Sequence, residues 1–231
     1  MLKELLSLFR SADALAAMAR DFNEMMSVAH DITVRAGKMF FSEDVEDERR
    51  QISKRDVEIN QLERGIRKQV IAHLTLGASA GDIPYCLLLM SIVKDVERIG
   101  DYAKNLSEVR HEGGAPIPVD TLGTELREIR DLVEATFAEV SKVFSSSDAA
   151  AAAALITRGR GVNRRCDQLI AGIAASDYNA ATATSMVLGA RYYKRIGSHL
   201  LNVLSGVVMP LHKLDYYDED VLANGDDEEV D

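Results

Sequence analysis

Four polar side chains at helical spacing are the clearest candidates for chemistry in this chain of 231 residues. They lie in the segment KDVERIGDYAKNLSE, residues 94–108, and are Glu97, Asp101, Asn105 and Glu108. At about 3.6 residues per turn they stack along one face of a helix whose opposite face is apolar. Carboxylate oxygens one turn apart can bind a divalent cation, and they can equally form a hydrated surface. Spacing alone leaves both interpretations open.

A second polar stripe is predicted on the preceding helix, about residues 47–76. The sequence places this stripe opposite the apolar face of that helix, with the members Asp56, Asn60, Glu63 and Arg67. Adjacent antiparallel helices would bring the two stripes side by side, where carboxylates without cations repel each other. A metal held by oxygen ligands would relieve that repulsion. Ion pairs with Arg67, Arg98 and Lys104 would relieve it too.

Six long helices are expected to position these side chains, which makes the fold class all-α. The first helix covers about residues 2–40, because two seams at heptad spacing are apolar at every position. The seams are Leu15, Phe22, Ala29, Ala36 and Met18, Met25, Ile32, Met39. Short loops between successive helices predict antiparallel neighbours.

The chain divides into two tandem antiparallel three-helix bundles. Residues 111–120, HEGGAPIPVD, hold two of the four prolines and a pair of glycines, which marks a linker. We therefore expect a first bundle over residues 1–110 and a second over residues 121–210. Residues 211–231 form an acidic tail that we expect to be mobile.

The negative charge of the chain is concentrated in this tail. Residues 215–231 contain nine acids and no base, so removing −9 from the net charge of −10 leaves about −1 for the other 214 residues. Nucleic acid is not an expected partner, because binding it requires a concentrated basic face. Cys86 and Cys166 lack metal-ligand spacing, and the N-terminus lacks the apolar run of a secretory signal. We expect a cytoplasmic protein without direct membrane insertion, since the longest apolar stretch, residues 83–93, is too short to span.

The third helix of each predicted bundle shares a motif. Residues 96–107, VERIGDYAKNLS, align with residues 193–204, YKRIGSHLLNVL, at an offset of 97. Both segments contain Arg-Ile-Gly and an asparagine at equal positions, which indicates an internal repeat. A glycine inside a helix costs about 1 kcal/mol relative to alanine. Its recurrence therefore predicts close approach of a neighbouring helix at Gly100 and at Gly197.

The motif, the helix count and the repeat resemble the PhoU family of phosphate-transport regulators. The phrase DVERIGDYAKN, residues 95–105, is similar to the signature of that family, and the resemblance covers about residues 12–208. It implies two three-helix bundles, each with a Glu/Asp-x-x-x-Asp motif on its third helix that is associated with iron or zinc clusters. Carried over to this sequence, the implied metal site consists of Glu97 and Asp101, with Asp56, Asn60 and Glu63 as neighbours. The implied cofactor is Fe, Zn or another divalent metal.

The second half departs from this pattern. Lys194 stands at the position of Glu97, and Ser198 at that of Asp101. The fifth helix carries Arg158, Arg160, Arg164 and Arg165 in place of an acidic stripe. An ammonium group cannot ligate a cation, so a second metal cluster is not expected. The basic face could attract an anion or an acidic partner, or it could be a decayed site whose cations are solvated.

The resemblance implies a non-enzymatic regulator of phosphate transport and phosphate homeostasis. Such a regulator contacts a membrane transporter component or a sensor kinase and often forms a homodimer. The alternative is an accessory subunit of another inorganic-ion transporter, built on the same scaffold without a metal.

A ferritin-like di-iron enzyme is the competing class. It would need inward-facing acids and two Glu-x-x-His motifs. One such spacing occurs, Glu108 to His111, and it runs into the linker. The acidic stripes are also expected to face away from the core. No nucleophile motif or Gly-rich phosphate loop is present, which favours a non-enzyme.

Overall fold

The computed structural model describes residues 2–42 and 46–215, with side chains from Asp13 onward. Within these residues the chain forms six long α-helices, one short 3-10 helix and no strand. Their bounds are α1 Leu2–Phe41, α2 Glu46–Thr75, α3 Ile83–Glu108, α4 Thr121–Ser146, α5 Ala149–Ala174, α6 Ala180–Val208 and η1 Leu211–Lys213. The all-α fold with six long helices that the sequence predicts is confirmed.

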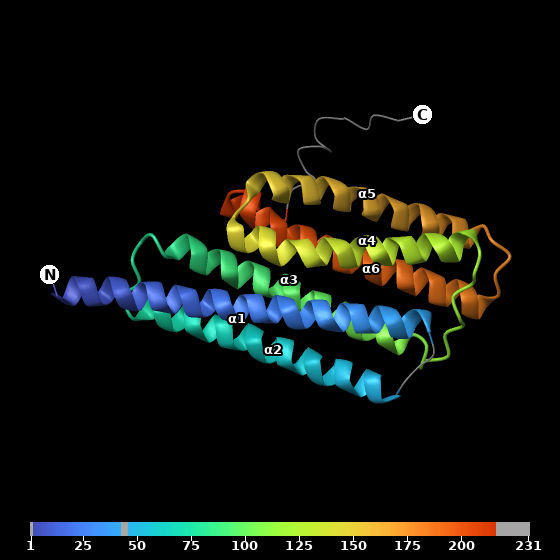
Figure 1. The fold of residues 1–231 in the computed structure, drawn as a ribbon, viewed down its shortest axis with the longest axis horizontal. Helices are drawn as coiled ribbons and strands as arrows, with labels where there is room; N and C mark the ends of the chain where they lie inside the picture. The colour runs from blue at the N-terminus through green and yellow to red at the C-terminus, as the bar shows by residue number, and fades with distance from the viewer. Residues whose placement is uncertain (1, 43–45, 216–231) are drawn as a thin grey trace.

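The helices form two antiparallel three-helix bundles that lie side by side along their length (Figure 1). Helices α1, α2 and α3 pack on one another, as do α4, α5 and α6, and the bundles meet where α3 packs on α6 and α1 on α4. Helix α2 lies at the outer edge of the first bundle (Figure 1). No helix among the described residues is long and apolar enough to cross a membrane.

One continuous apolar core runs through both bundles. The predicted seams of α1 belong to it, with every member from Met18 to Met39 buried and Leu15 partly buried. Met26 and Phe40, outside those seams, are buried as well. Helix α1 packs on α4 in addition to its own bundle, and the Phe40 ring lies against Gly189 of α6. The linker therefore joins two halves that share a core.

The linker is held against the start of α4 by Arg127 and Gly123. The Arg127 guanidinium donates to the carbonyl oxygens of Pro118 at 2.8 Å and Ile117 at 3.1 Å. A Cβ atom at Gly123 would lie 1.9 Å from the Pro118 carbonyl oxygen, so no larger residue fits this path. The Asp120 carboxylate accepts from the Gly123 N–H at 2.9 Å and caps α4.

The first residues of the expected tail are folded. Helix η1 packs on α3, Leu214 is buried, and the Asp215 N–H donates to Ser205 Oγ at 3.2 Å. Residues 211–215, which the sequence predicted to belong to the tail, are therefore part of the folded body. The prediction that it is mobile concerns residues 216–231, which lie outside the described residues.

Candidate functional site

The acidic stripe of α2 does not lie where the sequence analysis placed it. Asp56 and Glu63 are buried, with 4% and 7% of their surface exposed, on the side of the helix that carries Ile59. The expectation that this stripe faces away from the apolar seam is wrong. At about 100° per residue, Asp56 stands only about 60° from Ile59, so the stripe borders the seam. That border faces the groove between α2 and α3.

Helix α3 presents its two motif carboxylates to the same groove. The Glu97 side chain is 12% exposed and that of Asp101 is 34% exposed. On the other side of the helix, the predicted apolar residues are buried: Ile92, Val96, Ile99, Ala103 and Leu106. Asn105 and Glu108 are half-buried further along the same stripe. The predicted arrangement of α3 is therefore found.

Gly100 allows the two helices to come close at this point. A Cβ atom there would lie 2.8 Å from Ile59 Cδ1 and 3.5 Å from Asp56 Oδ1. The close approach predicted at Gly100 is confirmed. At Gly197 the nearest atoms to such a Cβ would be Asn163 Oδ1 at 3.5 Å and Val133 Cγ2 at 3.9 Å, which is ordinary contact. The corresponding prediction for Gly197 is wrong, because the neighbouring helices leave room there.

Three carboxylates from two helices come together in the groove: Asp56, Glu97 and Asp101. We call them the α2–α3 acidic cluster. Burial raises the pKa of Asp101 above its ordinary value, and the negative charges of Glu97 and Asp56 raise it further, against the opposing effect of Arg98 and Lys94. The repulsion inferred from the sequence is therefore present.

Basic side chains compensate most of this charge. Lys94 Nζ lies 2.7 Å from Glu97 Oε2, Arg98 Nη1 lies 3.3 Å from Asp101 Oδ2, and Lys104 Nζ lies 3.5 Å from Asp56 Oδ2. Glu63 pairs with Arg67, one turn later on α2, at 3.0 Å. Asn60, half-buried between Asp56 and Glu63, makes no side-chain hydrogen bond within the described residues.

The cluster partly fits a metal held by oxygen ligands. Three carboxylate oxygens are buried without a well-aligned hydrogen bond: Asp56 Oδ1, Glu63 Oε1 and Glu97 Oε2. Among the described residues Asp56 Oδ1 has no cation beside it, whereas Glu63 Oε1 and Glu97 Oε2 are contacted by Arg67 and Lys94. Such oxygens are the ligands that hard divalent cations prefer. In the described positions, however, no group of three or more His, Cys, Asp or Glu side chains over residues 13–42 and 46–215 is arranged to hold a metal ion. The oxygen ligands are of the type that such a metal prefers, but in this structure the carboxylates form ion pairs with nearby bases.

The equivalent place in the second bundle is filled by internal partners. Lys194 Nζ lies 2.6 Å from Asp167 Oδ1, and Ser198 Oγ donates to the Lys194 carbonyl oxygen at 2.9 Å. Arg165 binds Glu125 at 2.7 Å, and Arg158 binds Glu139 at 2.5 Å. Most of the basic face is thus neutralised by acids of its own bundle, which supports the decayed-site interpretation.

Sequence reasoning missed a buried acid on the motif helix. Asp95 is 8% exposed and faces α6, where His199 Nδ1 and Asn202 Nδ2 lie 2.8 Å and 2.7 Å from Asp95 Oδ1. The Tyr102 ring stacks on His199 with centroids 5.7 Å apart. The sequence does indicate that Asp95 is buried, because this residue falls between Ile92 and Ile99 on the apolar face of the helix.

A second missed pair lies where α1, α4 and α6 meet. Tyr193 Oη and Glu134 Oε1 are buried without a hydrogen-bond partner, and a Cβ atom at Gly37 would lie 2.8 Å and 2.7 Å from them. Burial raises the pKa of Glu134 to about 7, with Arg130 and Lys38 opposing the shift and Asp131 adding to it. Nothing in the local sequence marks Glu134, because its burial depends on the contact between bundles.

Comparison with known proteins decides the family of the first bundle. The PhoU domain family matches residues 22–109, which cover the second half of α1, all of α2 and the motif helix. The first bundle is similar to a PhoU domain. Polar groups link residues 22–109 to the second bundle in two places: Asp95 contacts His199, and Gly37 lies against Glu134 and Tyr193.

One curated relative is a phosphate-specific transport system accessory protein PhoU homolog from Synechocystis sp. (strain ATCC 27184 / PCC 6803 / Kazusa). It is 41% identical over 59 residues, which cover 25% of this chain and 26% of the relative. The match thus spans about a quarter of the length of that curated protein.

Two solved PhoU structures share the fold over both bundles. The phosphate transport system regulatory protein PhoU from Streptococcus pneumoniae superposes with a TM-score of 0.76 at 16% identity, over 85% of this chain and 94% of that one. PhoU from Pseudomonas aeruginosa superposes with a TM-score of 0.67 at 22% identity, over 87% and 95%. These structures place the second bundle in the same fold as the PhoU domain.

Proposed function

We propose that this protein is a non-enzymatic regulator of phosphate transport that acts in the cytoplasm by contact with a transporter component or a sensor kinase. The observation that carries the proposal is the PhoU domain over residues 22–109. The curated relative that is 41% identical over 59 residues is a phosphate-specific transport system accessory protein PhoU homolog. The two-bundle fold of solved PhoU proteins supports the same role for the whole chain.

The proposal includes a divalent metal, Fe or Zn among the candidates, at the α2–α3 acidic cluster. Its support is the group of buried carboxylate oxygens on Asp56, Glu63 and Glu97 that make no well-aligned hydrogen bond within the described residues, among which Asp56 Oδ1 also has no cation beside it. A bound divalent cation would supply charge that Lys94 and Lys104 supply in the described structure. Metal binding would therefore compete with these lysines, and the second bundle, with Lys194 and Ser198, would bind none.

The function is tested by deleting the gene and measuring phosphate uptake and the phosphate-starvation response. The deletion is expected to alter both, and the intact gene on a plasmid is expected to restore them. An unchanged response would contradict the regulator proposal. It would favour the alternative, an accessory subunit for another inorganic ion, because the scaffold itself specifies no ion.

The metal is tested separately by elemental analysis of the purified protein after reconstitution. The double variant Glu97→Ala with Asp101→Ala is expected to lose at least nine-tenths of the bound metal. The matched control, Lys194→Ala with Ser198→Ala on α6, is expected to keep it. Absence of metal from the reconstituted protein, or loss in the control alone, would contradict the metal site and leave the regulator role untouched.

A further inference from the structure

The outer face of α2 carries a straight row of exposed side chains dominated by bases. At alternating steps of four and three residues the exposed positions are Arg50, Lys54, Val57, Gln61, Arg64, Lys68 and Ile71. These steps keep all seven on one face of the helix. We call this row the α2 ridge. It holds four cations and no acid, on a chain whose net charge is −10.

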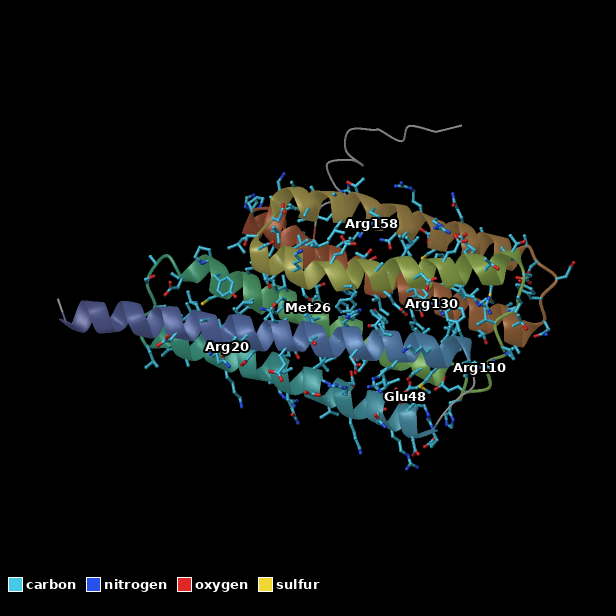
Figure 2. The ribbon with its side chains drawn as sticks, in the orientation of Figure 1. Arg20, Met26, Glu48, Arg110, Arg130 and Arg158 are labelled. Atoms are coloured by element: carbon cyan, nitrogen blue, oxygen red, sulfur yellow. The ribbon has the colours of Figure 1, made fainter. Side chains whose placement is uncertain are left out.

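Most of the ridge cations lack a partner. Arg50 pairs with Glu46 at 3.0 Å. Lys54, Arg64 and Lys68 make no ion pair or hydrogen bond with any described residue. Two apolar side chains in the row are also exposed, Val57 by 50% and Ile71 by 58%. Figure 2 shows side chains of α2 projecting away from the rest of the molecule.

The ridge is not a general property of this scaffold. Helix α5 occupies the corresponding place in the second bundle, and its outer row reads Ala150, Ala154, Thr157, Arg164, Gln168 and Ala171. That row contains a single cation. Arg165 of α5 and Lys194 of α6 are paired with acids of their own bundle. Arg191 and Arg195 of α6 are exposed and make no ion pair with a described residue. The row of three unpaired cations along α2 therefore has no counterpart on the outer face of α5.

The chain itself contains a segment of matching chemistry. Residues 216–231 hold eight acids and no base, together with the apolar pair Val221 and Leu222. Sixteen extended residues span up to about 53 Å, and the ridge from Arg50 to Ile71 is about 32 Å long. The segment is thus long enough to follow the whole ridge and to place carboxylates over its bases.

The position of the ridge favours a segment from another copy. Asp215, the residue before this segment, donates a hydrogen bond from its N–H to Ser205 Oγ on α6. Helix α2 lies at the far edge of the first bundle, packed on α1 and α3 (Figure 1). A chain would have to pass around its own first bundle to reach this ridge, whereas the ridge is open to a second molecule.

We propose that residues 216–231 of a second copy dock on the α2 ridge, held by Lys54, Arg64 and Lys68. The contact is electrostatic and exposed, so it weakens as salt screens the charges. It joins two copies head to tail. It is independent of phosphate and of the metal, and it brings the acidic segment of one molecule beside the PhoU domain of another.

The test uses the full-length chain with a photo-crosslinking residue, p-benzoylphenylalanine, in place of Leu222. A mixture of isotopically heavy and light protein is irradiated at 50 mM and at 500 mM salt, and crosslinked peptides are identified by mass spectrometry. We expect heavy–light crosslinks between the segment and α2, reduced at least fivefold at the higher salt. The variant Arg64→Glu with Lys68→Glu is expected to lose them. The matched control, Arg164→Glu with Arg195→Glu on the second bundle, is expected to keep them.

Three other results would contradict the proposal, and each would point to a different binding site for the segment or the ridge. Crosslinks to α2 within one copy only would mean that the segment docks on its own molecule. Crosslinks to the second bundle that the control variant loses would place the segment there. If no crosslink forms and the intact protein binds phosphatidylglycerol vesicles through Arg64 and Lys68, the ridge faces an anionic membrane. The exposed ridge positions tolerate charge reversal, and thermal unfolding of both double variants verifies that they fold.

Discussion

Helices α3 and α6 hold the same place in the two bundles and share Arg-Ile-Gly at the same position, yet they carry opposite chemistry. On α3, Glu97 and Asp101 join Asp56 in a groove where the carboxylates repel one another and Asp56 Oδ1 is buried without a hydrogen-bond donor among the described residues. On α6, Lys194 and Ser198 are satisfied by Asp167 and by the backbone. The two helices therefore keep the same place in the fold, while only α3 keeps a cluster of carboxylates that repel one another.

The same two helices also meet each other, and there the repeat is asymmetric again. At the offset of 97, Tyr102 corresponds to His199 and Asp95 to Tyr192. The contact Asp95–His199 is polar, whereas its counterpart Tyr192–Tyr102 is a pair of rings 6.2 Å apart. The interface between bundles thus has one half held by hydrogen bonds and one half by aromatic packing.

The largest effect is expected from Asp95→Ala, which removes the polar half of this interface. His199 and Asn202 lose a charged acceptor, so the free energy of unfolding should fall by about 3 kcal/mol. Urea unfolding measures the loss. Asp95→Asn keeps an acceptor oxygen and should lose less, and Tyr192→Phe should change stability by less than about 0.5 kcal/mol. Equal losses for Asp95→Ala and Tyr192→Phe would refute the asymmetry.

A smaller effect is expected from pH, through Glu134 beside Tyr193 of α6. The unfolded carboxyl releases its proton near pH 4.5, while the folded one keeps it until about pH 7. Unfolding between these values releases a proton, so stability is full below pH 4.5 and falls as the pH rises through 7. Because the site is partly exposed, we expect a loss of about 2 kcal/mol. Unfolding of Glu134→Gln over pH 4.5–8 should lack this decline, and a parallel decline in the variant would contradict the assignment.

The two repeated glycines should respond differently to alanine, with an effect of about 1 kcal/mol at most. Gly197→Ala meets only ordinary contacts and should stabilise α6 by nearly that amount. Gly100→Ala must displace Ile59 Cδ1 from 2.8 Å, so its gain should be smaller or reversed. Thermal unfolding of both single variants decides the order, and a greater gain at Gly100 would contradict the close approach of α2 and α3.

The smallest effect is expected from Asp101→Asn. Burial and the nearby charges of Glu97 and Asp56 raise the pKa of Asp101, so the neutral amide should stabilise the protein at pH 7 by a few tenths of a kcal/mol. The gain should disappear near pH 3, where the wild-type carboxyl is itself protonated. Comparison of denaturation midpoints at the two pH values measures it, and destabilisation at pH 7 would mean that the pair with Arg98 outweighs the repulsion.

Periodicity was sufficient for most of the fold and for half of the site. The seams of α1 and the linker glycines predicted the helices and their order, because apolar spacing and turn residues act locally. The stripe Glu97 and Asp101 followed from the same spacing. The burial of Asp56 and Glu63 did not, since a residue next to an apolar seam is exposed or buried according to which helix covers it.

By itself, then, the sequence determined six amphipathic helices, their repeat, and the loss of the acidic motif at Lys194 and Ser198. Only the tertiary structure decided that Asp95 binds His199, that Glu134 and Tyr193 lie at Gly37, and that α1 packs on α4. The physical reason is that helix periodicity is set within a few residues of chain. Contacts between α3 and α6 or α1 and α4 depend on how two bundles share one core.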